Sequence, residues 1–73
     1  MKTKLSYKEQ QEYMRLEAEI EELEQEKSSL EAELSAGKLG YESLELKSTR
    51  IADVIELIDA KLQRWMELGQ YVE

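Results

Sequence analysis

The chain contains no cysteine, no histidine and no proline among its 73 residues. Without cysteine and histidine it can form no disulfide or usual zinc site, and it lacks the thiol nucleophile and the commonest general base. The absence of proline leaves long helices uninterrupted. A chain this short forms at most one small domain with a limited core. These absences favour a binding role over a catalytic one, with no cofactor in the chain itself.

Long hydrophobic runs are also missing. No segment approaches the roughly 18 consecutive apolar residues of a membrane span, and the N-terminus lacks the hydrophobic core of a signal peptide. The lack of cysteine fits a reducing compartment. We therefore expect a cytoplasmic protein with no membrane partner.

Apolar residues instead recur at alternating spacings of three and four, the heptad pattern of coiled coils. The first run comprises Tyr13, Leu16, Ile20, Leu23, Lys27, Leu30 and Leu34. The second run comprises Leu44, Ser48, Ile51, Ile55, Ile58, Leu62, Trp65, Gly69 and Val72. Two long helices with one break between them are therefore predicted.

The ends of these helices carry recognisable signals. Ser6 and Glu9 form a Ser-x-x-Glu capping box, in which both side chains satisfy free backbone amides. Gly37 or Gly40 can adopt the left-handed conformation that ends a helix. The sequence therefore predicts a first helix at about 6–36, a turn at about 37–41 and a second helix at about 42–71.

A turn of this length makes the two helices antiparallel. Residues whose numbers sum to roughly 78 then lie opposite each other, which pairs Tyr13 with Trp65 at the open end and Leu23 with Ile55. Lys27 and Ser48 become polar seam positions that fix the register. The predicted fold is all-α, a two-helix antiparallel coiled-coil hairpin forming a single domain over 1–73. Heptads of this length can also pair between chains, so a homodimer stays open.

The formal net charge of −7 is unevenly distributed. Residues 17–35 contain eight glutamates and one lysine, whereas residues 1–16 contain four basic and two acidic residues. Phosphate contacts need lysine and arginine, so the acidic middle argues against nucleic acid lying along the whole molecule. That objection does not apply to the N-terminal segment.

Two motifs at the ends of the chain carry a family resemblance. The segment Lys2-Thr3-Lys4-Leu5-Ser6-Tyr7-Lys8-Glu9-Gln10 resembles the Lys-Lys-Leu-Ser-Tyr-Lys-Glu-Gln opening of the C-terminal domain of ABC-F ATPases of the Uup type. Arg64-Trp65-Met66-Glu67-Leu68 resembles the Arg-Trp-x-Glu-Leu near the end of that domain. The motifs stand in the expected order, so the resemblance covers nearly the whole chain.

The resemblance implies a non-catalytic C-terminal coiled-coil arm of a soluble protein with two ATP-binding cassettes and no membrane domain. Such proteins act in translation at the ribosome, and Uup-like arms are linked to DNA binding. ATP and magnesium belong to the cassettes, because this chain has no Gly-rich phosphate loop. The chain is therefore expected to be an excised domain, with its own cassettes among its partners.

Residues around the open end divide into structural and binding candidates. Ser6, Glu9, Tyr13 and Trp65 are assigned structural roles in the cap and the aromatic pair. Six basic residues are candidates for a docking patch for DNA or ribosomal RNA: Lys2, Lys4, Lys8, Arg15, Lys61 and Arg64. Because the chain is acidic overall, such binding should be weak and salt dependent. The alternative is a protein-interaction or self-associating spacer without nucleic-acid contact.

Overall fold

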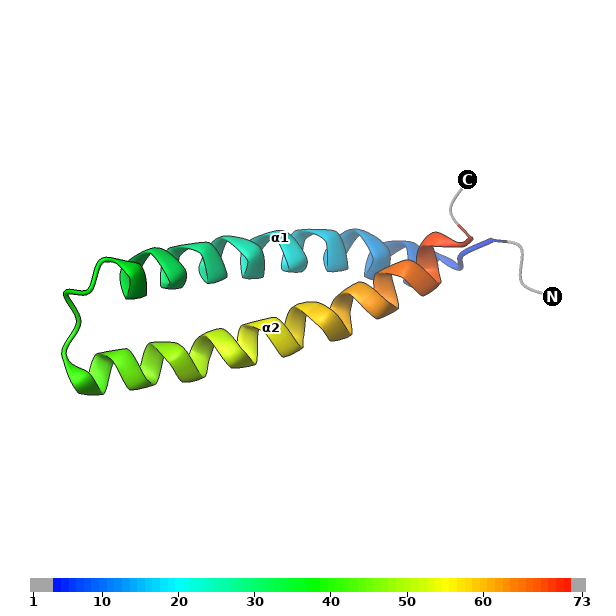
Figure 1. Ribbon diagram of the computed structural model, residues 1–73. Coiled ribbons are helices and arrows are strands. Elements are labelled where there is room, and N and C mark those ends of the chain that lie inside the picture. The colour runs from blue at the N-terminus through cyan, green and yellow to red at the C-terminus, as the bar shows by residue number, and fades with distance from the viewer. Residues whose placement is uncertain (1–3, 72–73) are drawn as a thin grey trace.

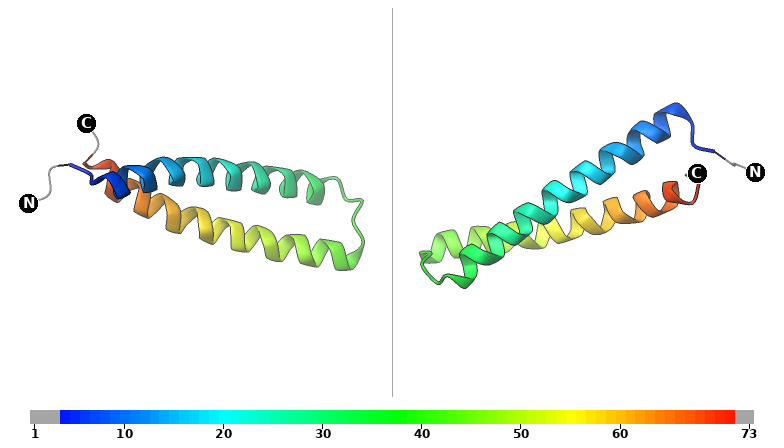
Figure 2. Two further views of the ribbon diagram at one scale, coloured as in Figure 1. Left: turned by 180° about the vertical axis from the view of Figure 1, so that it is seen from behind. Right: turned by 90° about the horizontal axis from the view of Figure 1, so that it is seen from above.

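The protein is a hairpin of two helices that run antiparallel side by side (Figure 1). The computed structural model describes residues 4–71, in which α1 (Tyr7–Ser35) and α2 (Tyr41–Gly69) are joined by residues 36–40. No strand occurs within these residues, so the predicted all-α hairpin is confirmed. The molecule measures 54 × 15 × 15 Å, and the helices cross at a shallow angle when seen from above (Figure 2).

The start of α1 has the capping box that the sequence indicates. The Ser6 backbone N–H donates to Glu9 Oε1 at 2.9 Å, and the Glu9 N–H donates to Ser6 Oγ at 3.2 Å. A cap of this kind stabilises a helix by about 1 kcal/mol.

The turn uses its two glycines differently. Gly37 has φ of +68°, the left-handed conformation that favours glycine, and its N–H donates to the Leu34 carbonyl at 3.3 Å. Gly40 has φ of −71° and ψ of 166°, an extended conformation open to other residues, and precedes α2 without a side-chain cap. Gly37 is therefore the glycine that ends α1.

The seam of α1 follows the predicted heptads. Leu16 and Leu30 are buried, and the remaining seam residues are half-buried: Tyr13, Ile20, Leu23, Lys27 and Leu34. Their spacing of three and four places them in one stripe facing α2.

The seam of α2 differs from the prediction at several positions. Val54 is fully buried at 0% exposure, whereas Ile55, predicted to face Leu23 in the seam, is 41% exposed. Ser48 is also exposed and does not form the polar layer assigned to it. The structure keeps Ile51, Ile58 and Trp65 in the seam. Between them it buries Val54 and Leu68 and half-buries Lys47 and Lys61, whereas the predicted seam residues Leu62 and Gly69 are half-buried beside this row.

A cluster of buried residues lies at the open end, where both ends of the described chain meet (Figure 1). Leu5, Leu16 and Leu68 form a buried cluster, against which Tyr13, Trp65 and Tyr71 pack. The rings of Tyr13 and Trp65 stack with centroids 5.5 Å apart and planes inclined by 14°. This is the pair that the register of 78 sets opposite each other, because 13 and 65 sum to that number.

Candidate functional site

One edge of the hairpin carries four ion pairs between the helices, which we call the ion-paired edge. Its acidic members are glutamates of α1 that repeat every seven residues and so form one row: Glu12, Glu19, Glu26 and Glu33. The pairs are Arg64–Glu12 at 2.8 Å, Lys61–Glu19 at 3.0 Å, Arg50–Glu26 at 2.6 Å and Lys47–Glu33 at 2.5 Å. This edge joins the two helices along most of their length.

The two arginines make bidentate contacts, the strongest geometry for a carboxylate. Arg50 donates from Nε to Glu26 Oε2 at 2.6 Å and from Nη2 to Oε1 at 2.9 Å. Arg64 contacts Glu12 likewise, at 2.8 and 3.0 Å, and also reaches Glu67 at 3.2 Å. The hydrogen bonds that Arg50 donates lower the pKa of the Glu26 carboxyl, and those that Arg64 donates to Glu12 and Glu67 raise the pKa of Arg64.

Lys47 and Lys61 occupy seam positions yet keep their charges in contact with carboxylates. Both residues are half-buried, and their Nζ atoms lie 2.5 Å from Glu33 and 3.0 Å from Glu19, respectively. Long lysine side chains can pack their methylenes along an apolar seam while the ammonium group stays at the edge. This arrangement explains how two lysines replace apolar residues in the seam of α2.

The lowered pKa of Glu26 makes a prediction for the pH dependence of stability. A carboxyl whose folded pKa lies below its usual 4.5 stabilises the fold above that pH, and this stabilisation is lost as pH falls through the lowered value. We expect Glu26→Gln to lower the melting temperature at pH 7 and to have a vanishing effect well below pH 4.5. Circular dichroism melts of both proteins across this range measure the difference. Glu45→Gln is the control, and an E26Q effect that persists undiminished in acid would contradict the assignment.

The six basic candidates do not form a single free patch. Lys2 lies outside the described residues, while Lys4, Lys8 and Arg15 are exposed and join no ion pair within residues 4–71. Lys61 and Arg64 are committed to Glu19 and Glu12 on the ion-paired edge. Lys61 also lies level with Glu19, about 18 Å along α1 from its first turn. Among the described candidates, those without an ion pair therefore lie on the N-terminal side of the open end.

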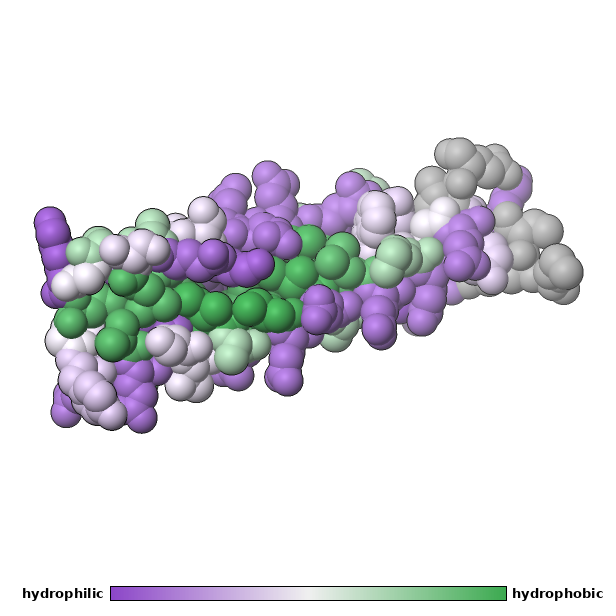
Figure 3. Space-filling model, viewed as in Figure 1, coloured by the Kyte–Doolittle hydropathy of each residue, from purple (hydrophilic) through white to green (hydrophobic). Residues whose placement is uncertain are grey.

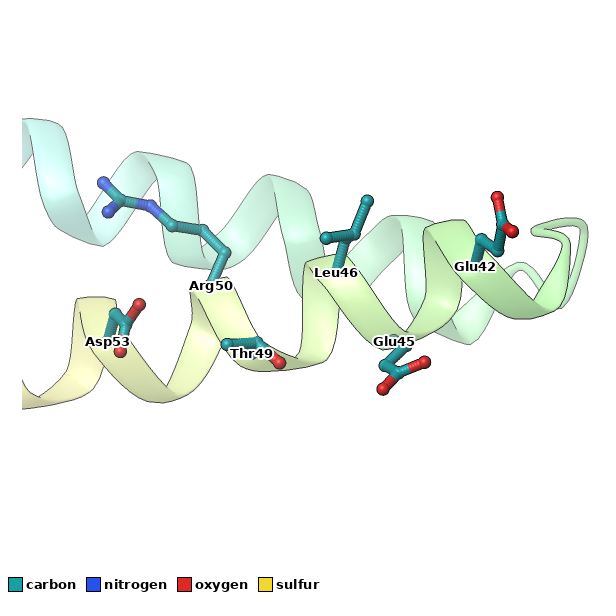
Figure 4. A pocket seen from close by; sticks show the side chains of 6 residues that line it. All are labelled: Glu42, Glu45, Leu46, Thr49, Arg50 and Asp53. Atoms are coloured by element: carbon teal, nitrogen blue, oxygen red, sulfur yellow. The ribbon is translucent and has the colours of Figure 1, made fainter.

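Surface hollows beside the helices are shallow and formed by side chains of the helix faces. One of them is lined by α2 alone: Glu42, Glu45, Leu46, Thr49, Arg50 and Asp53 (Figure 4). Arg50 points towards α1, where it pairs with Glu26, whereas Glu45 and Thr49 point away from it (Figure 4). This hollow is thus a depression beside the ion-paired edge.

Residues 4–71 contain neither a cluster of metal ligands nor a membrane-spanning helix. Within that range no group of three or more acidic residues is arranged to hold a metal ion. Neither α1 nor α2 contains an apolar stretch sufficient to cross a membrane, as judged over the same residues.

Comparison with known proteins identifies the family. The model of the ABC transporter C-terminal domain matches residues 4–70. The chain is 33% identical over 70 residues to the uncharacterised ABC transporter ATP-binding protein YfmR of Bacillus subtilis (strain 168). The matched segment makes up 96% of this chain but only 11% of that protein. No solved structure matches. The resemblance carried by the two end motifs to the C-terminal domain of an ABC ATPase is confirmed, and the chain belongs to the ABC transporter C-terminal domain family.

Proposed function

We propose that this chain is the non-catalytic C-terminal arm of a cytoplasmic ABC-F ATPase and contacts the phosphate backbone of DNA or ribosomal RNA with its open end. ATP and magnesium act in the cassettes of such a protein, and this chain contributes the two-helix arm that makes the nucleic-acid contact. The family match, the resemblance of both end motifs to Uup-type arms and the distribution of free cations support the proposal.

The observation that carries the proposal is the position of Lys4, Lys8 and Arg15. Lys8 and Arg15 are seven residues apart on α1, so they share one helix face at a rise of about 10 Å. Lys4 precedes the helix at the same end. All three side chains belong to exposed residues without an ion-pair partner in the described chain, and they can neutralise phosphates without breaking the fold.

The acidic remainder of the hairpin sets the geometry of this contact. The eight glutamates of residues 17–35 repel a phosphate backbone laid along α1. Nucleic acid should therefore meet the open end and leave the turn far away, about 40 Å along a helix of 29 residues. The binding is non-specific, because lysine and arginine contacts to phosphate carry no sequence information.

The salt dependence of binding tests the proposal. Three phosphate contacts give a slope of about −2.7 in log K against log salt, so raising NaCl from ~50 to ~200 mM should weaken duplex DNA binding roughly 40-fold. The combined variant Lys4→Gln, Lys8→Gln and Arg15→Gln should lose this binding while keeping its helix content. Fluorescence anisotropy of labelled duplex DNA and of a ribosomal RNA fragment measures the salt dependence of binding and the loss of binding in the variant.

A single substitution at the other end provides the matched control. Lys38→Gln removes one exposed lysine from the turn, whereas Lys8→Gln removes one from the open end. The proposal requires a clear loss of affinity with Lys8→Gln and little change with Lys38→Gln. Equal effects of the two substitutions, or no binding at ~50 mM salt, would reject the open end as a nucleic-acid contact.

A further inference from the structure

The edge opposite the ion-paired edge is built from different residues. On α1 it carries a second row of glutamates at seven-residue spacing: Glu17, Glu24 and Glu31. In the antiparallel register these lie across from Leu62, Ile55 and Ser48 of α2, none of which can neutralise a carboxylate. No ion pair joins the three glutamates to any residue within 4–71.

Apolar side chains are open to solvent along this edge, and we call them the apolar strip: Ile20, Leu44, Ile51, Ile55 and Leu62. Leu44 and Ile55 are 42% and 41% exposed, and the other three are half-buried. Figure 3 views this side and shows a continuous hydrophobic band between the helices, from the turn to the middle of the molecule, with hydrophilic residues on both sides.

A shallow hollow marks the end of the apolar strip nearest to the termini. Ile20, Leu62 and Trp65 form its apolar floor, and Glu17 and Glu21 stand at its rim. The strip thus combines an apolar surface with carboxylates along one flank. Its length from Leu44 to Leu62 is about 27 Å, enough to accommodate a helix of roughly 18 residues.

We propose that the apolar strip docks a basic amphipathic helix of a protein partner, which lies in the groove between α1 and α2 as a third helix. The partner's apolar stripe covers Leu44, Ile55 and Leu62, and its lysines or arginines on the α1 side meet Glu17, Glu24 and Glu31. Helix-in-groove recognition uses this combination of apolar anchors at three- and four-residue spacing with charged flanks.

Charge complementarity favours this occupant over a second copy of the chain. A second hairpin laid on the strip would bring its own glutamate row, and the chain has a net charge of −7. Like charges opposed across an interface disfavour association. A basic helix converts the same carboxylates into favourable contacts, so the surface is complementary to a partner of opposite charge.

The probe for this surface is a fluorescein-labelled synthetic peptide of about three heptads, with leucine at the seam positions and lysine at the flanking positions. A peptide of the same composition but scrambled order controls for charge alone. We expect the heptad peptide to bind the 73-residue chain in fluorescence anisotropy and the scrambled peptide to bind much more weakly.

Pairs of exposed aliphatic residues on the two edges give a matched test of the apolar contact. The double variant Leu44→Gln and Ile55→Gln should weaken peptide binding by at least about tenfold, which corresponds to 1.4 kcal/mol. The control is Leu46→Gln with Leu57→Gln, two exposed residues beside Arg50 on the ion-paired edge. Leu57 is 40% exposed, close to the value for Ile55, and Leu46 is 72% exposed against 42% for Leu44, so the control removes at least as much exposed apolar surface as the test variant.

The contribution of the glutamates beside the strip is tested by comparing two double variants that have the same net charge. Glu24→Gln with Glu31→Gln should weaken binding more than Glu22→Gln with Glu56→Gln, because Glu22 and Glu56 lie away from the strip. Equal losses in either matched comparison, or equal binding of the scrambled peptide, would overturn the proposal. A dimer detected by sedimentation that dissociates only when Leu44 and Ile55 are substituted would also overturn it, since a second copy would then cover the strip. Lys4, Lys8 and Arg15 take no part, so this test is independent of nucleic-acid binding.

Discussion

Replacing Leu68 by alanine is expected to destabilise the hairpin by about 2–5 kcal/mol, the usual cost of removing a buried leucine side chain. Leu68 is 2% exposed and packs with Leu5 and Leu16 at the open end. A domain of this size has a total free energy of unfolding of only roughly 4–11 kcal/mol, at 0.05–0.15 kcal/mol per residue. The substitution should therefore remove a large part of the stability, visible in thermal or urea unfolding monitored by circular dichroism.

Leu44→Ala is the matched control, because it makes the same chemical change in the same helix. Leu44 is 42% exposed, so truncation removes fewer packed contacts and should cost less than about 1 kcal/mol. The comparison also tests the assignment of the α2 seam, since the sequence pattern placed Leu44 in it and omitted Leu68. Similar losses for both variants would show that the seam includes Leu44 as fully as Leu68.

The architecture and the register could be predicted from the sequence because both depend on local signals. Ser6 and Glu9 mark the start of α1, Gly37 marks its end, and the short turn leaves antiparallel packing as the arrangement that buries both stripes. The register then follows from counting outwards from the turn, which sets Tyr13 against Trp65.

The buried face of α2 could not be predicted from hydrophobicity, because two rows compete for the same seam. Both share Ile51, Ile58 and Trp65. The row predicted from the sequence adds Ser48, Ile55, Leu62 and Gly69, whereas the row found in the structure adds Lys47, Val54, Lys61 and Leu68. By composition the second row is the less favourable of the two for a buried seam, because it includes two lysines.

The choice between these rows depends on charges across the two helices. Turning α2 to bury the second row brings Lys47 and Lys61 to Glu33 and Glu19 and places the two arginines beside Glu26 and Glu12. Turning it the other way would bury Ile55 but move all four cations away from α1. This orientation therefore combines the four ion pairs with burial of Val54 and Leu68, and it leaves Ile55 and Leu62 accessible along the apolar strip.

The ion-paired edge could have been predicted from a seven-residue spacing in the sequence. Glu12, Glu19, Glu26 and Glu33 fall on one row of α1, and the four basic residues of α2 fall at spacings of 14 in two pairs, 47 with 61 and 50 with 64. Assigning Lys61 and Arg64 to a binding patch overlooked this pattern. Their carboxylate partners lie on the other helix, and only an explicit register brings them together.

Trp65→Ala is expected to have an even larger effect on stability, about 3–5 kcal/mol, because it removes the largest side chain of the open end. The indole stacks on Tyr13 with centroids 5.5 Å apart and packs against the cluster of Leu5, Leu16 and Leu68. The loss should be measured by circular dichroism, since this variant contains no tryptophan to report fluorescence. In a domain of this size such a loss removes a large part of the total free energy of unfolding.

Trp65→Phe separates packing from hydrogen bonding at the same position. The indole Nε1 is buried and has no hydrogen-bond partner within the described part of the chain, so phenylalanine removes a polar group that contributes little. The ring stack with Tyr13 is retained. We therefore expect a much smaller loss than with alanine, and a loss as large as that of Trp65→Ala would indicate that the N–H has a partner.

A double-mutant cycle isolates the stack itself. Tyr13→Leu and Trp65→Leu, made singly and together, should show a coupling free energy of about 0.5–1.5 kcal/mol, the contribution of an aromatic pair beyond its buried area. Tyr13 also lies over Gly69, where a Cβ atom would stand 3.6 Å from Cε1, an ordinary contact. Gly69→Ala should therefore leave the coupling unchanged. A coupling near zero would mean that the two rings act only through their separate contacts with the leucine cluster, and that the stack does not itself hold the open end together.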